Sequence, residues 1–347
     1  MIISPIDGKY EFLTEQGKVY KLKKNNIIYF TALKDSISVW DLDQHIGIFK
    51  TIKFNSLSKN SLCKVESAYP ALTPRNYNGN FTINTQNGEL CVLNYTDIDT
   101  YLAGVVEAEA GPNAPYEFYK SQAIISRTYL LEIINREGKQ KYILGDDVNH
   151  QVFKGVSTKN ELILQAVQHT NDLVIIDTLQ RLITAAFHSN SGGQTLNSED
   201  VWLSSTSYLK GTPDPFSLDQ RNTFWQDSIL LSDWYKYLEN NGIIIDSIDT
   251  DSLTFLQKNR LKYLEIKNDT IPLRKIREDF KLRSTWFSLI PKGNYLFIEG
   301  RGYGHGVGLS QEGGMEMARQ NYSFLDIIHF YYKNVKVVNY KLVFANL

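Results

Sequence analysis

The first 95 residues carry the pattern of short β-strands. Runs rich in β-branched and aromatic residues occupy positions 27–30, 38–40 and 81–83, and clusters of turn-forming residues separate them. Asn87 and Gly88 stand between two such runs. Because both residues tolerate a positive φ, they predict a tight hairpin of type I′. The N-terminal portion is therefore expected to be β-rich.

Helical patterns appear after Asp97. Pro115 predicts the start of a helix that has Glu117 in its first turn and runs to about Arg136. Ser323 begins a segment that resembles a capping box and predicts a last helix through about Tyr332. Further elements are expected as helices over 158–169 and 233–240, as a hairpin of strands 173–177 and 182–187, and as a strand over 261–266.

The order of these elements predicts an α+β fold, in which mixed antiparallel β-structure and several helices follow a β-rich N-terminal portion. We find no internal repeat and no low-complexity linker between the two portions. The sequence therefore leaves two arrangements open, one core shared by both portions or a separate core in each.

An apolar run over residues 101–106 ends in two carboxyl side chains, Glu107 and Glu109, before Gly111 and Pro112 force a loop. Desolvation at the mouth of an apolar segment disfavours the charged form of a carboxyl group. It is expected to raise the pKa of that group and to suit it to general acid catalysis. The alternative is that both glutamates are solvated loop residues, and their spacing alone does not decide between the two.

The helix after Pro115 is apolar on nearly every face, so it is expected to be buried. Lys120 and Arg127 lie two helical turns apart and therefore on one face. Buried cations need partners or anionic ligands. Arg127 is a candidate partner of Glu109 or contact to substrate, whereas Lys120 is as well explained by a structural ion pair or by a lysine whose head reaches solvent.

Two further segments concentrate polar side chains and glycines. Residues 187–195 follow an apolar strand and include His188, Ser191 and two glycines, which suits a loop for a polar ligand but also an ordinary tight turn. Residues 300–311 contain five glycines in alternation. As a strand, this segment would place Tyr303, His305 and Val307 on one face and leave the glycine face for close approach of a ligand or backbone.

Composition narrows the function. The chain has 347 residues, 42% of them hydrophobic and 12% aromatic, with 37 basic and 38 acidic side chains and a net charge of −1. This composition excludes wholesale disorder, and the balance of charge gives no support for a nucleic-acid partner. Cys63 and Cys91 are 28 positions apart in strand-like segments; either a disulfide or two buried thiols fits.

No run reaches the roughly 20 apolar residues of a transmembrane helix, and the N-terminus shows no export signal. The protein is therefore expected either in the cytosol or outside it after removal of a leader. The six histidines form no H-E-x-x-H or Cys/His cluster, and no G-x-S-x-G elbow supports a serine hydrolase. We expect no cofactor and no metal.

In this order the motifs resemble the catalytic domain of stage II sporulation protein D and the related amidase-enhancer proteins. The resemblance covers about residues 76–340 as a catalytic domain and leaves residues 1–75 as a separate β-rich region. The matching positions are Tyr101, Leu102, Gly104, Val105, Val106 and Glu109; Pro115, Glu117, Lys120, Gln122, Ala123, Arg127, Thr128 and Tyr129; residues 189–195, Val201, Trp202, Tyr208, Leu209 and Asp214; Arg277, Leu282, Arg283, Ser284 and Phe287; and residues 300–311.

The resemblance implies a lytic transglycosylase that cleaves peptide-free glycan strands of peptidoglycan after N-acetylmuramic acid and leaves a 1,6-anhydro product. It assigns the acid to Glu109 rather than Glu107. One carboxyl group suffices, because the attacking hydroxyl belongs to the substrate. The residues that would bind the sugar in a glycan cleft are Lys120, Gln122, Arg127, His188, Ser191, Tyr303, His305, Ser310 and Gln311.

The chain departs from the family pattern in three places. Some members carry zinc near a C-x-x-x-x-C/H stretch that here corresponds to residues 145–155, which contain no cysteine, so no zinc is expected. Ala110 follows Glu109 where the family has methionine or a similar residue, and the first 75 residues match only loosely. The family also implies a location outside the cytoplasm, at the cell-wall face. The alternative function is a non-catalytic glycan-binding module that stimulates a cell-wall amidase. It would use the same groove without a proton-donating acid.

Overall fold

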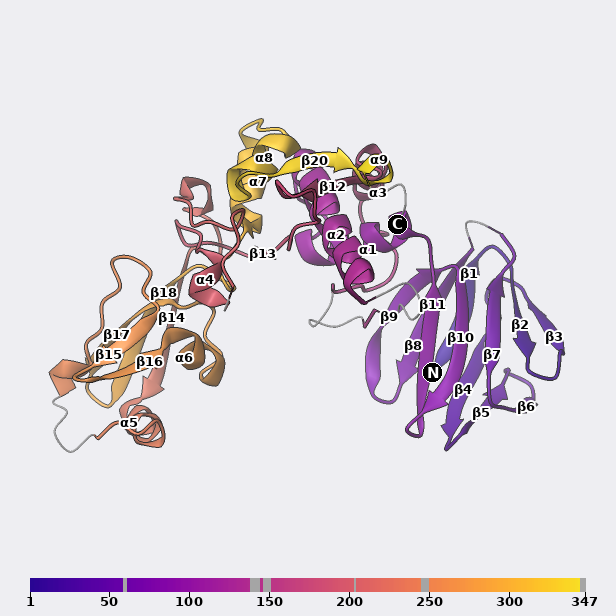
Figure 1. Cartoon of the computed structure of the whole chain (residues 1–347). Helices are drawn as coiled ribbons and strands as arrows, with labels where there is room; N and C mark the ends of the chain where they lie inside the picture. The colour runs from indigo at the N-terminus through magenta and orange to yellow at the C-terminus, as the bar shows by residue number, and fades with distance from the viewer. Residues whose placement is uncertain (59–60, 138–143, 146–150, 203, 245–249, 344–347) are drawn as a thin grey trace. The chain divides into compact units, whose positions relative to one another are not determined.

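The computed structural model describes residues 1–58, 61–137, 144–145, 151–202, 204–244 and 250–343 (Figure 1). The chain forms two compact units. The first unit comprises Met1–Asn113 and Ile133–Asn171, and the second comprises Ala114–Glu132 and Asp172–Leu347. The predicted boundary near residue 75 falls within a strand of the first unit and stays a prediction.

The first unit begins with a β-sandwich. Its strands form a sheet in the order β6-β5-β4-β1-β8-β9 and a second sheet in the order β11-β10-β7-β2-β3 (Figure 1). The bounds are β1 Ile2–Asp7, β2 Tyr10–Thr14, β3 Val19–Leu22, β4 Ile28–Leu33, β5 Ser36–Trp40, β6 His45–Phe49, β7 Ile52–Ser56, β8 Leu62–Ala68, β9 Ala71–Asn78, β10 Asn80–Gln86 and β11 Glu89–Tyr95.

Alternating burial along these strands gives both sheets an apolar inner face. Phe30 and Val39 of one sheet and Phe12 and Phe54 of the other belong to one buried core, so the sheets pack face to face. The hairpin prediction is confirmed: β10 pairs with β11 up to Gln86 and Glu89, and Asn87 and Gly88 between them have φ of 53° and 80°. Cys63 and Cys91 are free thiols.

Two helices complete the described part of the first unit, α1 Ile98–Ala110 and α3 Glu161–His169. The sequence analysis did not assign the apolar run over 101–106 to a helix. Asp97 caps α1 by accepting a hydrogen bond from the Thr100 N–H at 2.9 Å, and Gly111, with φ 72°, ends it. The helix packs closely on residues 153–155, because a side chain at Gly104 would collide with the Gly155 carbonyl and the Phe153 ring.

The second unit contains the first part of helix α2 and the remainder of the chain. Its helices are α2 Tyr116–Glu137, α4 Ser198–Val201, α5 Leu231–Asn240, α6 Leu273–Asp279, α7 Gln311–Arg319, α8 Phe324–Tyr331 and α9 Tyr340–Val343. Its strands are β12 Leu173–Ile176, β13 Phe187–His188, β14 Phe224–Leu230, β15 Tyr263–Ile266, β16 Asp269–Pro272, β17 Trp286–Lys292, β18 Tyr295–Arg301, β19 Leu309–Ser310 and β20 Lys336–Asn339, and short 3-10 turns occupy Pro215–Ser217 and Thr250–Leu253.

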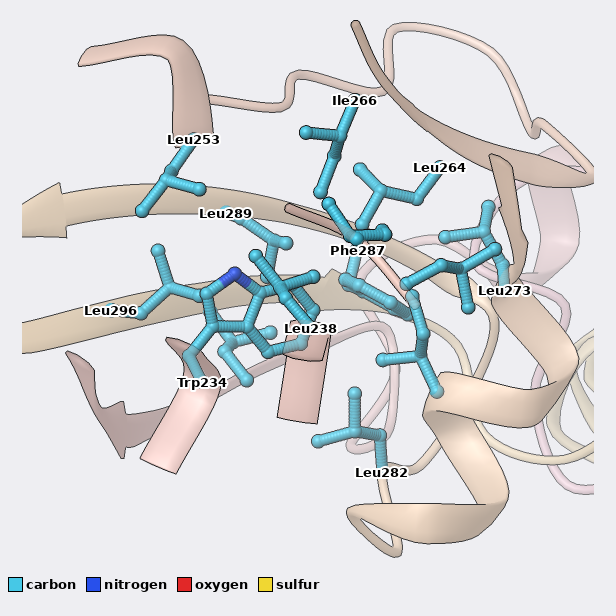
Figure 2. Close-up of a cluster of buried hydrophobic side chains, with 14 of the residues drawn as sticks. Trp234, Leu238, Leu253, Leu264, Ile266, Leu273, Leu282, Phe287, Leu289 and Leu296 are labelled. Carbon is cyan, nitrogen blue, oxygen red and sulfur yellow. The ribbon is translucent and has the colours of Figure 1, made fainter. Parts of the chain in front are cut away.

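A buried apolar cluster holds the middle of this unit together (Figure 2). Trp234 and Leu238 project from α5 onto Leu289 and Leu296 of the antiparallel sheet β14-β18-β17, and Leu273 brings in α6 (Figure 2). Trp234 and Leu273 are fully buried. This cluster fixes the start of α6, which carries a wall of the cleft described below.

Most of the predicted elements are confirmed. The helices expected after Pro115, over 158–169 and over 233–240 correspond to α2, α3 and α5, and the strand expected over 261–266 corresponds to β15. Ser323 and Asp326 form the capping box of α8. The α+β class is confirmed by this mixture of antiparallel sheets and helices. No described helix is long and apolar enough to cross a membrane.

The predicted hairpin of 173–177 and 182–187 is wrong beyond its turn. Asp177 closes the turn by accepting backbone hydrogen bonds from Leu179 and Arg181, and one bridge joins Ile176 to Leu182. The second run then leaves β12, because its end pairs with another strand: Phe187 and His188 form β13 against β19. The ladder of β12 instead goes to β20, from the C-terminal part of the chain.

Candidate functional site

Glu107 and Glu109 both lie in the last turn of α1, in the first unit. The preceding turn is apolar, because Val105 and Val106 are fully buried, whereas both glutamates are half-buried. The last turn of α1 contains no basic residue.

The carboxylate of Glu107 is bound to the loop that precedes α3. Its Oε2 accepts a hydrogen bond from the Ser157 hydroxyl at 2.6 Å and two more from the Thr158 and Lys159 N–H groups, each at 3.2 Å. Asn160 caps α3 and donates to the Pro112 carbonyl at 2.7 Å, which ties the same loop to the end of α1. Glu107 therefore has a structural role in joining two segments of the first unit.

Three of the predicted sugar-binding residues lie on α2, in the second unit. Lys120 forms an ion pair with Glu117 at 2.6 Å, and Glu117 also accepts the N–H of Phe324 at the start of α8. Gln122 and Arg127 are buried; the Arg127 guanidinium donates to the Leu173 carbonyl at 3.3 Å. These contacts give Lys120 and Arg127 structural partners. Contact of the three side chains with a sugar stays a prediction.

The second unit brings the two glycine-containing motifs together. Strand β13 pairs in parallel with β19, which sets His188 opposite Ser310. Asn190 and Tyr303 exchange backbone hydrogen bonds at 3.0 and 2.8 Å, and the Leu196 N–H donates to the Gly306 carbonyl at 2.7 Å. Residues 187–196 and 300–311 therefore form one polar loop pair, although more than a hundred positions separate them in sequence.

Residues 302–308 do not form the predicted strand. Strand β18 ends at Arg301, and each glycine from Gly302 to Gly308 has a positive φ, between 71° and 109°. A strand would require negative φ at these positions. As a result Tyr303 is 44% exposed while Val307 is fully buried, so they do not share a face. Glycine is required at 308, where a side chain would collide with the Ala186 carbonyl.

The backbone of Val307 orients two histidine rings whose centroids are 5.5 Å apart. The Val307 carbonyl accepts from His188 Nδ1 at 3.1 Å, so the neutral His188 ring carries its proton on Nδ1. The Val307 N–H donates to His305 Nδ1 at 3.1 Å, so the neutral His305 ring carries its proton on Nε2. His188 Nε2 is buried and accepts no hydrogen bond from the described residues.

Both rings are uncharged at neutral pH. Burial lowers the pKa of His188 well below its usual value, and the nearby His305 ring and Arg260 guanidinium act in the same direction. Burial also lowers the pKa of His305 to about 4, although a hydrogen bond to the backbone of Phe187 opposes the shift, and the guanidinium groups of Arg277 and Arg260 contribute to it. The two histidines can therefore accept or donate hydrogen bonds as neutral groups, within a positive electrostatic environment.

Ser191 and Ser310 are fully buried, and their hydroxyl groups form hydrogen bonds that stabilise the loop pair. Ser191 Oγ donates to Asp214 at 2.7 Å, and Tyr331 OH donates to the other oxygen of that carboxylate at 3.1 Å. Burial raises the pKa of Asp214. Ser310 caps α7, accepting from the Gly313 N–H, and also accepts from the Ser191 N–H at 3.2 Å. Gln311 is the first residue of α7 and is 9% exposed.

His305 also lines a cleft of about 440 Å³ in the second unit. Trp202 packs against the His305 ring, with ring centroids 5.5 Å apart, and Arg260, Arg277 and Tyr263 contribute further walls. Neither arginine was predicted to bind a ligand. Arg277 belongs to a motif of the family resemblance, which was the only indication of a function for it. No motif contains Arg260 or Tyr263.

No group of three or more histidine, cysteine, aspartate or glutamate side chains that could hold a metal ion occurs among the described residues. The stretch in which some members of the family carry zinc includes positions 146–150, which lie outside the part of the chain that the structure describes. The expectation of no zinc therefore stays a prediction.

Comparison with known proteins confirms the family resemblance. A family model described as stage II sporulation protein matches residues 86–176. Stage II sporulation protein D of Bacillus subtilis (strain 168) is 28% identical over 257 residues, which cover 69% of this chain and 74% of that protein. An amidase enhancer of the same organism is 27% identical and matches over 69% of this chain but 40% of its own length. An uncharacterised protein of Brachyspira hyodysenteriae is 27% identical over 77% of this chain and 73% of its own.

Proposed function

From this similarity to stage II sporulation protein D, we propose that the chain acts on the bacterial cell wall as a peptidoglycan lytic transglycosylase. Its substrate is the glycan strand from which the peptide stems have been removed, and Glu109 is its acid and then its base. The names of the relatives support the cell-wall function. The stretch that the family model matches, residues 86–176, contains Glu109.

The reaction needs one carboxyl group and no water. Protonated Glu109 donates its proton to the glycosidic oxygen as the bond from that oxygen to C1 of an N-acetylmuramic acid residue breaks. The Glu109 carboxylate then removes the proton from the 6-hydroxyl of the same sugar, and O6 bonds to C1. The products are a 1,6-anhydro sugar end and a free 4-hydroxyl, and Glu109 is protonated again.

The family resemblance carries the assignment to Glu109, and the contacts of Glu107 support it. The Glu107 carboxylate accepts three hydrogen bonds from the loop before α3, which gives this side chain a structural role. Glu109 lies in the same last turn of α1, after a buried apolar turn.

The test is the incubation of the full chain and of Glu109→Gln with peptide-free glycan strands, with anhydro-muramic ends counted by mass spectrometry. We expect Glu109→Gln to slow their formation by about 10²-fold or more. Glu107→Gln is the matched control: it should lower the melting temperature but still form anhydro ends. The proposal is wrong if the wild-type chain forms none or if Glu109→Gln is fully active.

A second function is favoured by one observation, the similarity to a protein named amidase enhancer. In this case the chain would bind glycan strands without cleaving them and would stimulate a cell-wall amidase. Adding the chain and Glu109→Gln to an amidase assay distinguishes the two functions. Equal stimulation by both proteins, with no anhydro ends from either, would establish the binding module. Either function places the protein outside the cytoplasm, at the cell-wall face.

A further inference from the structure

The cleft of the second unit presents arginine side chains with unused hydrogen-bond donors. Arg260 and Arg277 lie on its wall together with His305. Nη2 of Arg260 donates to the Ser191 carbonyl at 2.9 Å, but its Nε and Nη1 are buried and have no acceptor among the described residues. Arg277 donates to no acceptor in the described part of the chain, and its Nε is buried. Buried donors without a partner are costly, which points to an absent acceptor.

The charges around the cleft do not supply that acceptor. Its lining contains four cationic side chains, of Arg260, Lys262, Arg274 and Arg277, and two carboxylates, of Asp200 and Glu278. Glu278 forms an ion pair with Arg274 at 2.8 Å, and Asp200 accepts from the side chain of Asn197 at 2.9 Å. Four cations against two carboxylates leave the cleft positively charged overall.

The electrostatics of neighbouring groups agree with this picture. Burial lowers the pKa of Arg260 to about 9, and the charge of Arg277 adds to the shift. Burial likewise lowers the pKa of Arg277. Two guanidinium groups that line one cleft attract an anion, and their planar donors suit a carboxylate.

The remaining walls of the cleft fit a sugar ring. Trp202 and Tyr263 provide aromatic surface beside the arginines, and the neutral His305 ring stands next to Trp202. A volume of about 440 Å³ is in the range of small-ligand pockets, which are mainly apolar with a few convergent polar groups. Aromatic faces beside paired guanidinium groups suit a sugar that bears a carboxylate.

We propose that this cleft is a carboxylate subsite, in which Arg277 and Arg260 bind the carboxylate of an acidic sugar and Trp202 packs against its ring. The identity of the sugar rests on the proposed function: the carboxylate is the lactyl group of N-acetylmuramic acid. An amide at this position has no charge, so it would leave the guanidinium groups without an anion. The subsite therefore distinguishes a free lactyl group from one that still bears a peptide.

The test uses the full chain carrying Glu109→Gln, so that no ligand is cleaved. The probes are the disaccharide of N-acetylglucosamine and N-acetylmuramic acid, the same disaccharide with its lactyl carboxylate converted to an amide, and chitobiose, each titrated by calorimetry. We expect the free acid to bind at least about tenfold more tightly than the other two. Adding Arg277→Gln should reduce its affinity to that of the amide, whereas Arg277→Lys should lose less.

Arg274→Gln is the matched control, because Arg274 lies on the same helix and lines the same cleft but is paired with Glu278. It should keep the preference for the acid. An independent readout is the pKa of His305 followed by NMR, which should rise from about 4 when the acid binds, because an anion offsets the guanidinium charges. If inorganic phosphate competes as well as the acid, the cleft is a general anion site and the proposal of a sugar-carboxylate subsite is wrong.

Equal binding of acid and amide, or an unchanged preference in Arg277→Gln, overturns the subsite even where the wild-type chain forms anhydro ends. Conversely, a preference for the acid that depends on Arg277 supports the subsite even where no anhydro ends form. The two proposals therefore fail separately.

Discussion

The end of α1 and the cleft of the second unit differ in the hydrogen-bond partners of their charged side chains. Glu107 at the end of α1 receives three hydrogen bonds from one loop. Arg277 in the cleft has no hydrogen-bond acceptor among the described residues, and Arg260 has one. Glu107, Arg260 and Arg277 are each half-buried. The difference is whether the chain itself supplies the partner.

This difference distinguishes charged side chains that stabilise the fold from charged side chains that bind a ligand. A carboxylate with several donors stabilises the segments it joins, whereas a desolvated cation without an acceptor costs stability and is retained where function needs it. By this criterion Glu107 is structural, Arg277 and Arg260 belong to a binding site, and the buried serines of the loop pair belong to the scaffold. Each prediction below tests one side of that distinction.

The largest effect should come from pH, through the burial of His305 and the guanidinium groups near it. The folded protein keeps this ring neutral down to its pKa of about 4, whereas the unfolded chain takes up a proton near 6.5. Between these values the unfolded state binds more protons, so the free energy of unfolding falls as the pH falls from 6.5 to 4. The expected loss is about 3 kcal/mol, measured by urea unfolding at pH 7 and pH 4.

His305→Gln is the control for this experiment, because glutamine can accept the Val307 N–H but does not titrate. The variant should lose about 3 kcal/mol less than the wild type over the same interval, because the titrating groups remote from His305 contribute equally to both proteins. An identical pH dependence in the two proteins would show that His305 is not held neutral by burial and by the two arginines.

The sequence predicted the β-rich N-terminal portion and most helices well, because local signals decide them, whereas the packing of its strands into a sandwich was not predicted. Alternation gives the sandwich strands their inner face, Asn87 and Gly88 specify the hairpin, and Ser323 with Asp326 specifies the start of α8. Helix α1 was missed although Asp97 and Gly111 mark its ends. The strand partner of β12 could not be predicted, since it comes from the far end of the chain.

The candidate site was predicted less completely. The pairing of residues 187–196 with 300–311 depends on contacts across more than a hundred positions, which no local pattern encodes. The alternating glycines suggested a strand, but their positive φ values reflect close approach of backbone, which only the folded chain determines. In sequence, Arg260 looks like an ordinary surface cation, and Arg277 was marked only by a motif of the family resemblance. Their significance comes from burial without a partner, which is a property of the structure.

A smaller effect is expected at Glu107, where the chain supplies the partners. Glu107→Gln replaces charge-assisted hydrogen bonds to Ser157 and two N–H groups with weaker ones. The free energy of unfolding should fall by about 1–2 kcal/mol at pH 7, measured by urea unfolding. Glu89→Gln, at an exposed strand position, should change it little. No loss in Glu107→Gln would remove the structural role that separates this residue from Glu109.

The smallest effect has the opposite sign and concerns Arg277. Replacing this partly desolvated cation by glutamine removes a charge that has no acceptor among the described residues, so Arg277→Gln should raise the free energy of unfolding by about 0.5–1 kcal/mol in the absence of ligand. Arg274→Gln breaks an exposed ion pair with Glu278 and should lower it by about 0.5 kcal/mol or less. Urea unfolding of both variants at pH 7 measures the difference.

Substitution of either a structural or a ligand-binding arginine would lower the affinity of the protein for the acidic sugar. The sign of the stability change therefore distinguishes the two roles. A loss in Arg277→Gln as large as that in Glu107→Gln would place Arg277 with the charges that hold the fold.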